Sequence, residues 1–127
     1  MVSVFQNVAI DCADAYELAR FWSGVTGCPL NPEDRPGDPE AQVMLPQGPL
    51  LHFNQVPEPK VVKNRIHLCL RPETSREEEV VRLLDLGATL VADRRRPDSS
   101  GWAVLADPEG NEFCVLRSES DRAATAS

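Results

Sequence analysis

The sequence predicts an α+β fold in which two βαβββ modules form a curved mixed sheet around a cavity, with the helices on the outer face. Three observations predict it. The order of strand, helix and three strands occurs twice along 127 residues. Asn7 and His67 occupy matching places 60 residues apart, and the turns that begin at Pro46 and Pro108 are 62 residues apart. Spacings this similar indicate an internal repeat with a slip of two residues within each module.

We expect one domain over residues 1–117, with module one at about 3–56 and module two at about 63–117. Residues 118–127 are small and polar, which is typical of a flexible, frayed tail. The segment Pro57-Glu-Pro-Lys60 is the one linker-like stretch, and it lies near the middle of the chain. The length suits a single core that buries roughly two-thirds of the unfolded surface.

Module one opens with a strand at Asn7–Cys12, where apolar residues alternate with small or polar ones. A helix over 15–25 follows, because Asp14 and Glu17 have capping-box spacing and Gly27 is a typical helix stop. Three further segments are expected to be strands: 28–34, 41–45 and 50–56.

Module two repeats this order. A strand over 65–71 places Ile66 on its apolar face and His67 on the opposite face. Thr74-Ser-Arg-Glu77 is a second capping-box candidate, and the helix that follows is expected to end near Gly87. The remaining elements are the strand 88–93 and the hairpin 102–117, whose turn is Asp107-Pro-Glu-Gly110.

The second strand of this hairpin has one core face and one polar face. Strand geometry places Phe113 and Val115 on the core side. The opposite side carries Glu112, Cys114 and Leu116, of which the first two have side chains that a functional site can use.

Composition excludes several function classes. A formal net charge of −7 argues against nucleic acid or an anionic membrane surface as a partner. The four cysteines form no CxxC pair and no disulfide framework. No secretory signal is expected, because no basic stretch precedes the short apolar opening Met1–Val4. Reduced thiols in a cytoplasmic protein are the simplest interpretation.

The double βαβββ plan resembles the vicinal oxygen chelate superfamily, with Lys63-Asn-Arg-Ile-His-Leu68 opening module two and Asp107-Pro-Glu-Gly-Asn111 closing it. That superfamily includes glyoxalase I, fosfomycin- and bleomycin-resistance proteins and extradiol dioxygenases. Val56-Pro-Glu-Pro-Lys60 and Asp107–Leu116 more narrowly resemble bacterial glyoxalase-like domain proteins. The resemblance covers about residues 3–117. It implies a small-molecule ligand or substrate and a homodimer, whose modules pair within one chain or across the dimer.

The resemblance also implies metal ligands on the first and last strands of each module. These positions are Asn7, His52, His67 and Cys114 here, and His67 is the residue type that the superfamily commonly uses at its position. We expect a divalent ion, if one binds, to be held by His67, His52 and Cys114. As thiolates beside the two imidazoles, Cys114 and Cys69 would favour Zn²⁺ over Mg²⁺ or Mn²⁺, whereas Fe(II) would need Glu112 to reach the site.

Other residues of the expected cavity have candidate roles. Glu112 or Asp11 is the expected general base in a catalytic site. Arg71 is expected to pair with Asp11 or to meet an anionic substrate. The expected ligand-binding residues are Asn7, Cys69, Arg71 and Trp102.

Two function classes follow. The first is a metal-free protein that binds a small organic molecule in the inter-module cavity. The second is a divalent-metal-dependent lyase, isomerase, transferase or dioxygenase acting on a substrate with vicinal oxygens. The metal-free interpretation is preferred, because Asn7, His52 and Cys114 depart from the usual ligand types at their positions.

Overall fold

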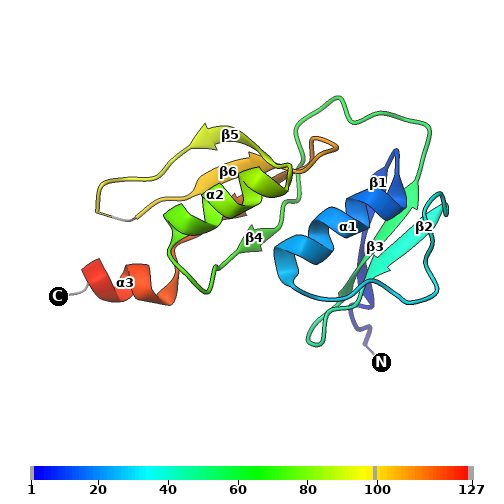
Figure 1. Cartoon of the computed structure of the whole chain (residues 1–127), viewed down its shortest axis with the longest axis horizontal. Helices are drawn as coiled ribbons and strands as arrows, with labels where there is room; N and C mark the ends of the chain where they lie inside the picture. The colour runs from blue at the N-terminus through cyan, green and yellow to red at the C-terminus, as the bar shows by residue number, and fades with distance from the viewer. Residues whose placement is uncertain (1, 99, 126–127) are drawn as a thin grey trace. The chain divides into compact units, whose positions relative to one another are not determined.

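The computed structural model describes residues 2–98 and 100–125. These residues form two mixed sheets and three helices, joined by loops (Figure 1). The chain divides into a first unit, Met1–Lys60, and a second unit, Val61–Ser127, and each is described by itself. This α+β arrangement confirms the predicted fold class. No helix in the described part of the chain has the length and hydropathy needed to cross a membrane.

The first unit contains one helix and a three-stranded sheet of order β1-β3-β2. Its elements are β1 (Asn7–Cys12), α1 (Ala15–Thr26), β2 (Glu40–Val43) and β3 (Leu50–Gln55). β1 pairs in parallel with β3, and β2 pairs antiparallel with β3. The strand expected over 28–34 is reduced to an isolated bridge between Leu30 and Val43.

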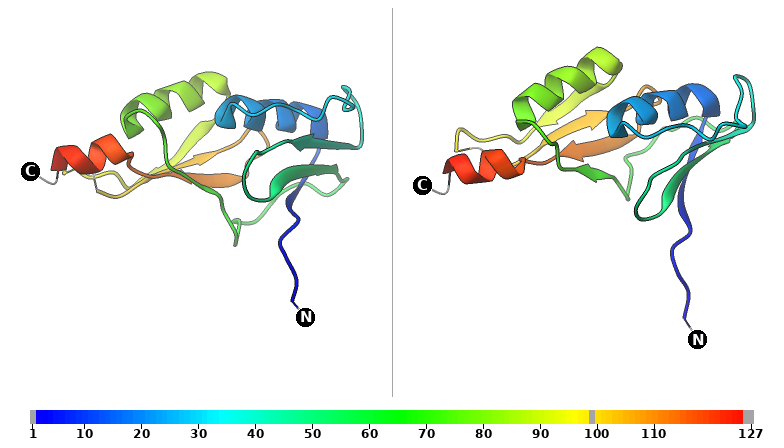
Figure 2. Two further views of the ribbon diagram at one scale, coloured as in Figure 1. Left: turned by 90° about the horizontal axis from the view of Figure 1, so that it is seen from below. Right: turned by 60° about the horizontal axis from the view of Figure 1, so that its bottom comes forward.

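Helix α1 begins and ends as predicted. The backbone N–H of Glu17 donates to Asp14 Oδ1 at 3.1 Å, and Gly27 ends the helix with φ +71°. The apolar stripe of α1, including Leu18 and Trp22, is buried against β2 and β3. Trp22 is therefore a core residue. Before β1, residues 2–6 extend away from this sheet (Figure 2).

The second unit contains a four-stranded sheet of order β4-β7-β6-β5. Its elements are β4 (Cys69–Leu70), α2 (Arg76–Leu86), β5 (Thr89–Asp93), β6 (Ala103–Ala106), β7 (Glu112–Val115) and α3 (Glu119–Thr125). Helix α2 lies over one face of this sheet (Figure 2), and its Val80 and Leu83 are buried there. The predicted 102–117 hairpin is confirmed, with Phe113 and Val115 in the core.

β4 is much shorter than the strand predicted over 65–71. The backbone N–H of Cys114 donates to Leu68 O, but the N–H of Glu112 donates to Asn64 Oδ1 at 2.8 Å. Because the Asn64 side chain supplies this acceptor, the backbone ladder does not extend to residue 66. Ile66 was expected on the apolar face and is instead 85% exposed.

Two helix starts differ from the prediction. The N-cap of α2 is Ser75 rather than Thr74, and its Oγ accepts the N–H of Glu78 at 3.2 Å. Helix α3 occupies most of the segment predicted as a frayed tail. Ser118 and Asp121 cap α3 reciprocally, with N–H to oxygen distances of 2.9 and 3.0 Å, and Ser118 is fully buried. This Ser-x-x-Asp spacing is a capping-box signal that the sequence interpretation missed.

The strand registers confirm the internal repeat. In each unit the first strand pairs in parallel with the last. Ala9 lies opposite His52, and Cys69 lies opposite Cys114. These two pairs correspond at offsets of 60 and 62, the same offsets that the sequence predicts. Asn7 and Ala9 are therefore the counterparts of His67 and Cys69.

Candidate functional site

Each sheet has one face against its helix and one face turned away from it, which we call the far face. In the first unit, Ala41, Val43, Leu51 and Phe53 are buried on the helix side. Because side chains alternate along a strand, the intervening residues of β2 and β3 lie on the far face. These residues are Gln42, His52 and Asn54.

A chain of hydrogen-bonded polar side chains crosses this far face. Gln42 Nε2 lies 2.9 Å from His52 Nδ1, and His52 Nε2 lies 3.0 Å from Asn54 Oδ1. An amide nitrogen only donates, so Nδ1 accepts and Nε2 carries the proton that it donates to Asn54. Asn31 Nδ2 donates to Gln42 Oε1 at 3.2 Å and so orients the Gln42 amide. Both ring nitrogens of His52 are therefore engaged within the first unit.

Three soft or borderline donors gather on the far face of the second sheet: His67, Cys69 and Cys114. Cys69 and Cys114 are directly opposed on the parallel strands β4 and β7, so their side chains leave the same face. His67 precedes Cys69 by two residues. One potential ligand atom from each residue lies within 4.8 Å of the other two. Cys114 is buried, whereas His67 and Cys69 are exposed.

The two thiols differ in their surroundings. Burial raises the pKa of the Cys114 thiol, and the neighbouring Cys69 thiol and Glu112 carboxylate act in the same direction. The Lys63 ammonium opposes this shift and lowers the pKa. Cys114 is therefore a protonated thiol at neutral pH, and a bound cation would have to displace its proton.

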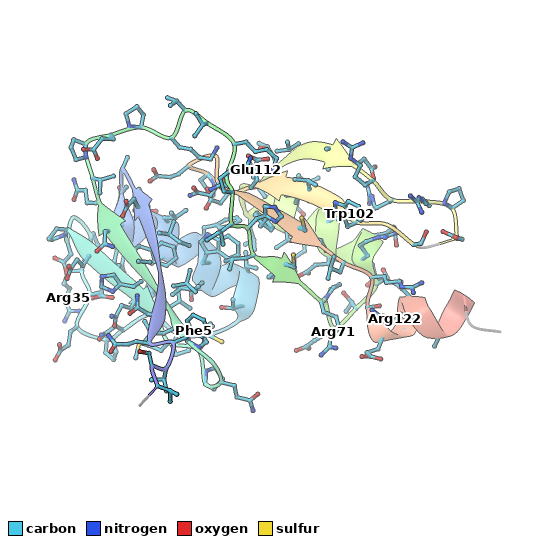
Figure 3. The ribbon with its side chains drawn as sticks, turned by 180° about the vertical axis from the view of Figure 1, so that it is seen from behind. Phe5, Arg35, Arg71, Trp102, Glu112 and Arg122 are labelled. Carbon is cyan, nitrogen blue, oxygen red and sulfur yellow. The ribbon has the colours of Figure 1, made fainter. Side chains whose placement is uncertain are left out.

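Glu112 lies at the start of β7 (Figure 3), close enough to the cluster for its carboxylate to raise the pKa of the Cys114 thiol. Its Oε1 accepts the backbone N–H of Asn64 at 3.3 Å, while its own N–H donates to the Asn64 side chain. This reciprocal pair ties residue 64 to β7 and fixes the start of the segment that carries His67. Glu112 is not one of the three clustered donors, and its predicted role as a base stays a prediction.

The other predicted site residues lie in less enclosed surroundings. Arg71 forms an exposed ion pair with Glu119 of α3 at 3.3 Å (Figure 3). Trp102 is 42% exposed just before β6, so it is not a core residue. Asp11, on β1, is exposed, and Asn7 begins the same strand half-buried. Their predicted roles in ligand binding and catalysis stay predictions.

The donor set of the second unit fits a borderline-soft metal ion. Two sulfur atoms and one imidazole nitrogen match the preference of Zn²⁺, whereas Mg²⁺ and Mn²⁺ prefer oxygen ligands. His67 and Cys114 were predicted as ligands, and the structure brings them together. Cys69 was predicted to contact an organic ligand, and the structure adds it to the donor set. His52, the third predicted ligand, belongs to the hydrogen-bonded chain of the first unit.

Sequence interpretation missed the polar residues around His52 and the Asn64–Glu112 pair. The alternation in Glu40–Val43 does place Gln42 on the same face as His52 of the neighbouring strand. The sequence does not give the register between β2 and β3, so this alternation could pair Gln42 with His52 only once the structure was known. Nothing in the sequence indicates that the Asn64 side chain replaces a backbone acceptor.

Comparison with known proteins supports the same fold. A family model described as a glyoxalase-like domain matches residues 7–116. A glyoxalase/bleomycin resistance protein/dioxygenase family enzyme from Burkholderia phytofirmans has a TM-score of 0.68 at 20% identity, covering 89% of this chain and 97% of that one. For a glyoxalase-related enzyme from Fulvimarina pelagi the TM-score is 0.65 at 18% identity, with 94% and 90% covered.

A lactoylglutathione lyase from Agrobacterium tumefaciens is also similar, with a TM-score of 0.62 at 17% identity, and 93% of this chain and 95% of that chain are covered. Identities this low show a shared fold alone. The search of curated proteins found no match.

Proposed function

This chain belongs to the glyoxalase-like domain family, and from that premise we propose that it binds a small organic molecule at the far faces of its sheets. One observation carries the proposal. His52 lies on the side of the first sheet turned away from its helix, and Glu112 and Cys114 lie on the corresponding side of the second sheet. Strand pairing holds these groups in fixed positions, as a specific binding site requires.

The polar side chains of the first unit indicate which functional groups such a ligand carries. His52 and the amides of Gln42 and Asn54 form a ready-made set of donors and acceptors, and the Glu40 carboxylate lies 3.9 Å from His52 Nε2. Such a set suits hydroxyl, carbonyl or carboxylate oxygens of a small polar compound. The inter-module cavity in which we predicted the ligand remains a prediction.

We expect such a ligand to raise the melting temperature of the full chain in the presence of a chelator. A thermal-shift screen of catechols, α-hydroxy ketones and 2-oxo acids tests this. A ligand at 100 times its Kd stabilises a protein by about 2.7 kcal/mol. Gln42→Leu, which removes the donor to His52 Nδ1, should abolish the shift. Arg20→Gln, on the exposed side of α1, is the matched control. An equal shift in both variants would reject the first far face as the binding surface.

A second candidate function is a metal-dependent lyase or dioxygenase acting on a substrate with vicinal oxygens. The clustering of His67, Cys69 and Cys114 favours it. Zn²⁺ bound there would supply a Lewis acid, and Glu112 or Asp11 would be the candidate base. Stabilisation by an organic ligand that always requires added Zn²⁺ would support this function over metal-free binding.

The proposal also covers the location, the oligomeric state and the excluded partners of the protein. The protein acts in the cytoplasm with four reduced cysteines, and it functions as a homodimer. Its net charge of −7 gives it no affinity for nucleic acid or anionic membranes. Sedimentation velocity at micromolar concentration tests the dimer, because a single monomer peak would overturn it.

A further inference from the structure

We propose that His67, Cys69 and Cys114 form a metal site closed within the second unit, which binds one Zn²⁺ ion without His52. This inference goes beyond the proposed binding of an organic molecule and does not depend on it. The site differs from the predicted set by using Cys69, which lies on β4 directly opposite Cys114.

The spacing of the donors suits one ion. Zn–S bonds are about 2.3 Å and Zn–N bonds about 2.0–2.1 Å, so tetrahedral ligand atoms lie roughly 3.3–3.8 Å apart. The three ligand atoms are already within 4.8 Å of one another. The ligand atoms therefore have to approach one another by at most about 1–1.5 Å to coordinate one ion.

Hydrogen bonds fix the backbone positions of the ligands. The N–H of Cys114 donates to Leu68 O at 2.9 Å, and the N–H of Leu116 donates to Leu70 O at 2.8 Å. These two bonds bracket Cys69 and hold it opposite Cys114. The reciprocal pair between Asn64 and Glu112 anchors the chain three residues before His67. Because these hydrogen bonds already fix the backbone positions of the three ligand residues, the residues lose little conformational entropy when the metal ion binds.

The chemistry of the donors selects the class of ion. Two thiolates and one imidazole bind a borderline-soft ion such as Zn²⁺ far better than Mg²⁺ or Mn²⁺. Three protein ligands leave a fourth tetrahedral position for water or a substrate atom, as in catalytic rather than structural zinc sites. Each thiol releases its proton on binding, so the complex weakens as the pH falls.

His52 is not needed for this site. Its two ring nitrogens are hydrogen-bonded to Gln42 and Asn54, and coordination would break one of these bonds. Its counterpart in the second unit is Cys114, and the counterparts of His67 and Cys69 in the first unit are Asn7 and Ala9. The described residues of the first unit therefore contain no equivalent donor set, and one ion per chain is expected.

The test is zinc binding by the untagged, reduced full chain, with no organic ligand present. After incubation with Zn²⁺ and gel filtration, elemental analysis should find about one equivalent per chain. A competition titration with a chromogenic chelator gives the affinity. Cys69→Ser should weaken it by about 100-fold or more, which is about 2.7 kcal/mol. Because Cys69 is exposed, this substitution leaves the core intact, and circular dichroism checks the fold.

Two control variants separate this site from other thiols and from the predicted ligand set. Cys28→Ser removes a partly buried cysteine of the first unit, and His52→Gln keeps hydrogen-bonding capacity while removing the imidazole. Both should bind zinc within twofold of the unchanged protein. No zinc retained by the unchanged chain, or equal affinity in Cys69→Ser, would overturn the proposal. A large loss in His52→Gln would overturn the claim that the second unit suffices.

Discussion

Gly101→Ala is expected to lower the free energy of unfolding by about 4 kcal/mol or more, at the upper end for a single substitution. Gly101 has φ +82°, a conformation that costs an L-residue about 1–2 kcal/mol. In addition, a Cβ there would clash with the carbonyl oxygen of Arg94. Because that oxygen belongs to the backbone, no side-chain rotation relieves the clash.

The clash falls at the residue pair that continues the β5–β6 ladder directly beyond Asp93 and Ala103. The N–H of Arg94 donates to Trp102 O at 2.9 Å, and the N–H of Trp102 donates to Arg94 O at 3.4 Å. Moving Arg94 away from residue 101 therefore breaks the connection between two strands of the second sheet. We expect hydrogen exchange in the folded variant to increase over 89–106 and to stay unchanged in β1 and β3.

Gly37→Ala is the matched control, because Gly37 has φ +88° but no atom within 4 Å of the position that an alanine methyl group would take. Gly37→Ala should lower the free energy of unfolding by only about 1–2 kcal/mol, the cost of a left-handed backbone conformation for an L-residue. Urea denaturation followed by circular dichroism measures both variants. If Gly101→Ala costs no more than Gly37→Ala, the close approach of residues 94 and 101 is wrong.

Arg76→Met should destabilise the second unit by about 2–4 kcal/mol, since hydrogen bonds from charged donors contribute about 1.5–3 kcal/mol each. The side chain of Arg76 is 1% exposed. Its Nη1 donates to the backbone carbonyls of Ser100 and Gly101 at 3.2 and 3.0 Å. Methionine keeps much of the apolar volume but leaves both carbonyls without this donor.

The backbone of Arg76 adds a link to α3. Its N–H donates to Asp121 Oδ2 at 2.9 Å. Although burial opposes the shift, hydrogen bonds from the backbones of Ser118 and Arg76 lower the pKa of Asp121. A lowered folded-state pKa stabilises the fold above the unfolded value, and this contribution is lost as the pH falls through the folded pKa. Acid should therefore loosen α3.

Arg82→Met provides the control for Arg76→Met on the same helix. Arg82 pairs with Glu79 one turn away, at 2.7 Å, and its side chain is 45% exposed. The contact is bidentate, with a second bond at 2.9 Å, and the Glu79 side chain is 12% exposed, so we expect this pair to contribute about 1 kcal/mol, the upper end for such pairs. Equal losses in the two variants, measured by urea denaturation, would show that the carbonyl contacts of Arg76 add nothing to stability.

The parts of the fold that sequence reasoning predicted depend on local signals. Alternation over Asn7–Cys12, the Asp14 cap and the Asp107-Pro-Glu-Gly110 turn each act within a few residues, and the structure has all three. The internal spacing then supplied long-range information, since it aligned His52 with Cys114 before any register was known.

The errors arose where side chains far apart in sequence decide the local structure. The strand over 65–71 is shortened because Asn64 bonds to Glu112, 48 residues later. Helix α3 is a different case, because its local Ser118-x-x-Asp121 cap was overlooked, and the bond from Arg76, 45 residues earlier, adds a contact that no local pattern shows. The same limit affected the metal ligands. Residue types singled out His67 and Cys114, but only the pairing of β4 with β7 brings Cys69 to them.

The most direct test of the site on the second sheet is the absorption spectrum of the full chain with Co²⁺ in place of Zn²⁺. Tetrahedral coordination by two thiolates and one imidazole predicts sulfur-to-cobalt charge-transfer bands in the near ultraviolet and intense visible bands. Cys69→Ser should halve the charge-transfer intensity, and His52→Gln should leave the spectrum unchanged. A spectrum like that of hexaaqua cobalt, with no sulfur-to-cobalt band, would contradict a metal site at His67, Cys69 and Cys114.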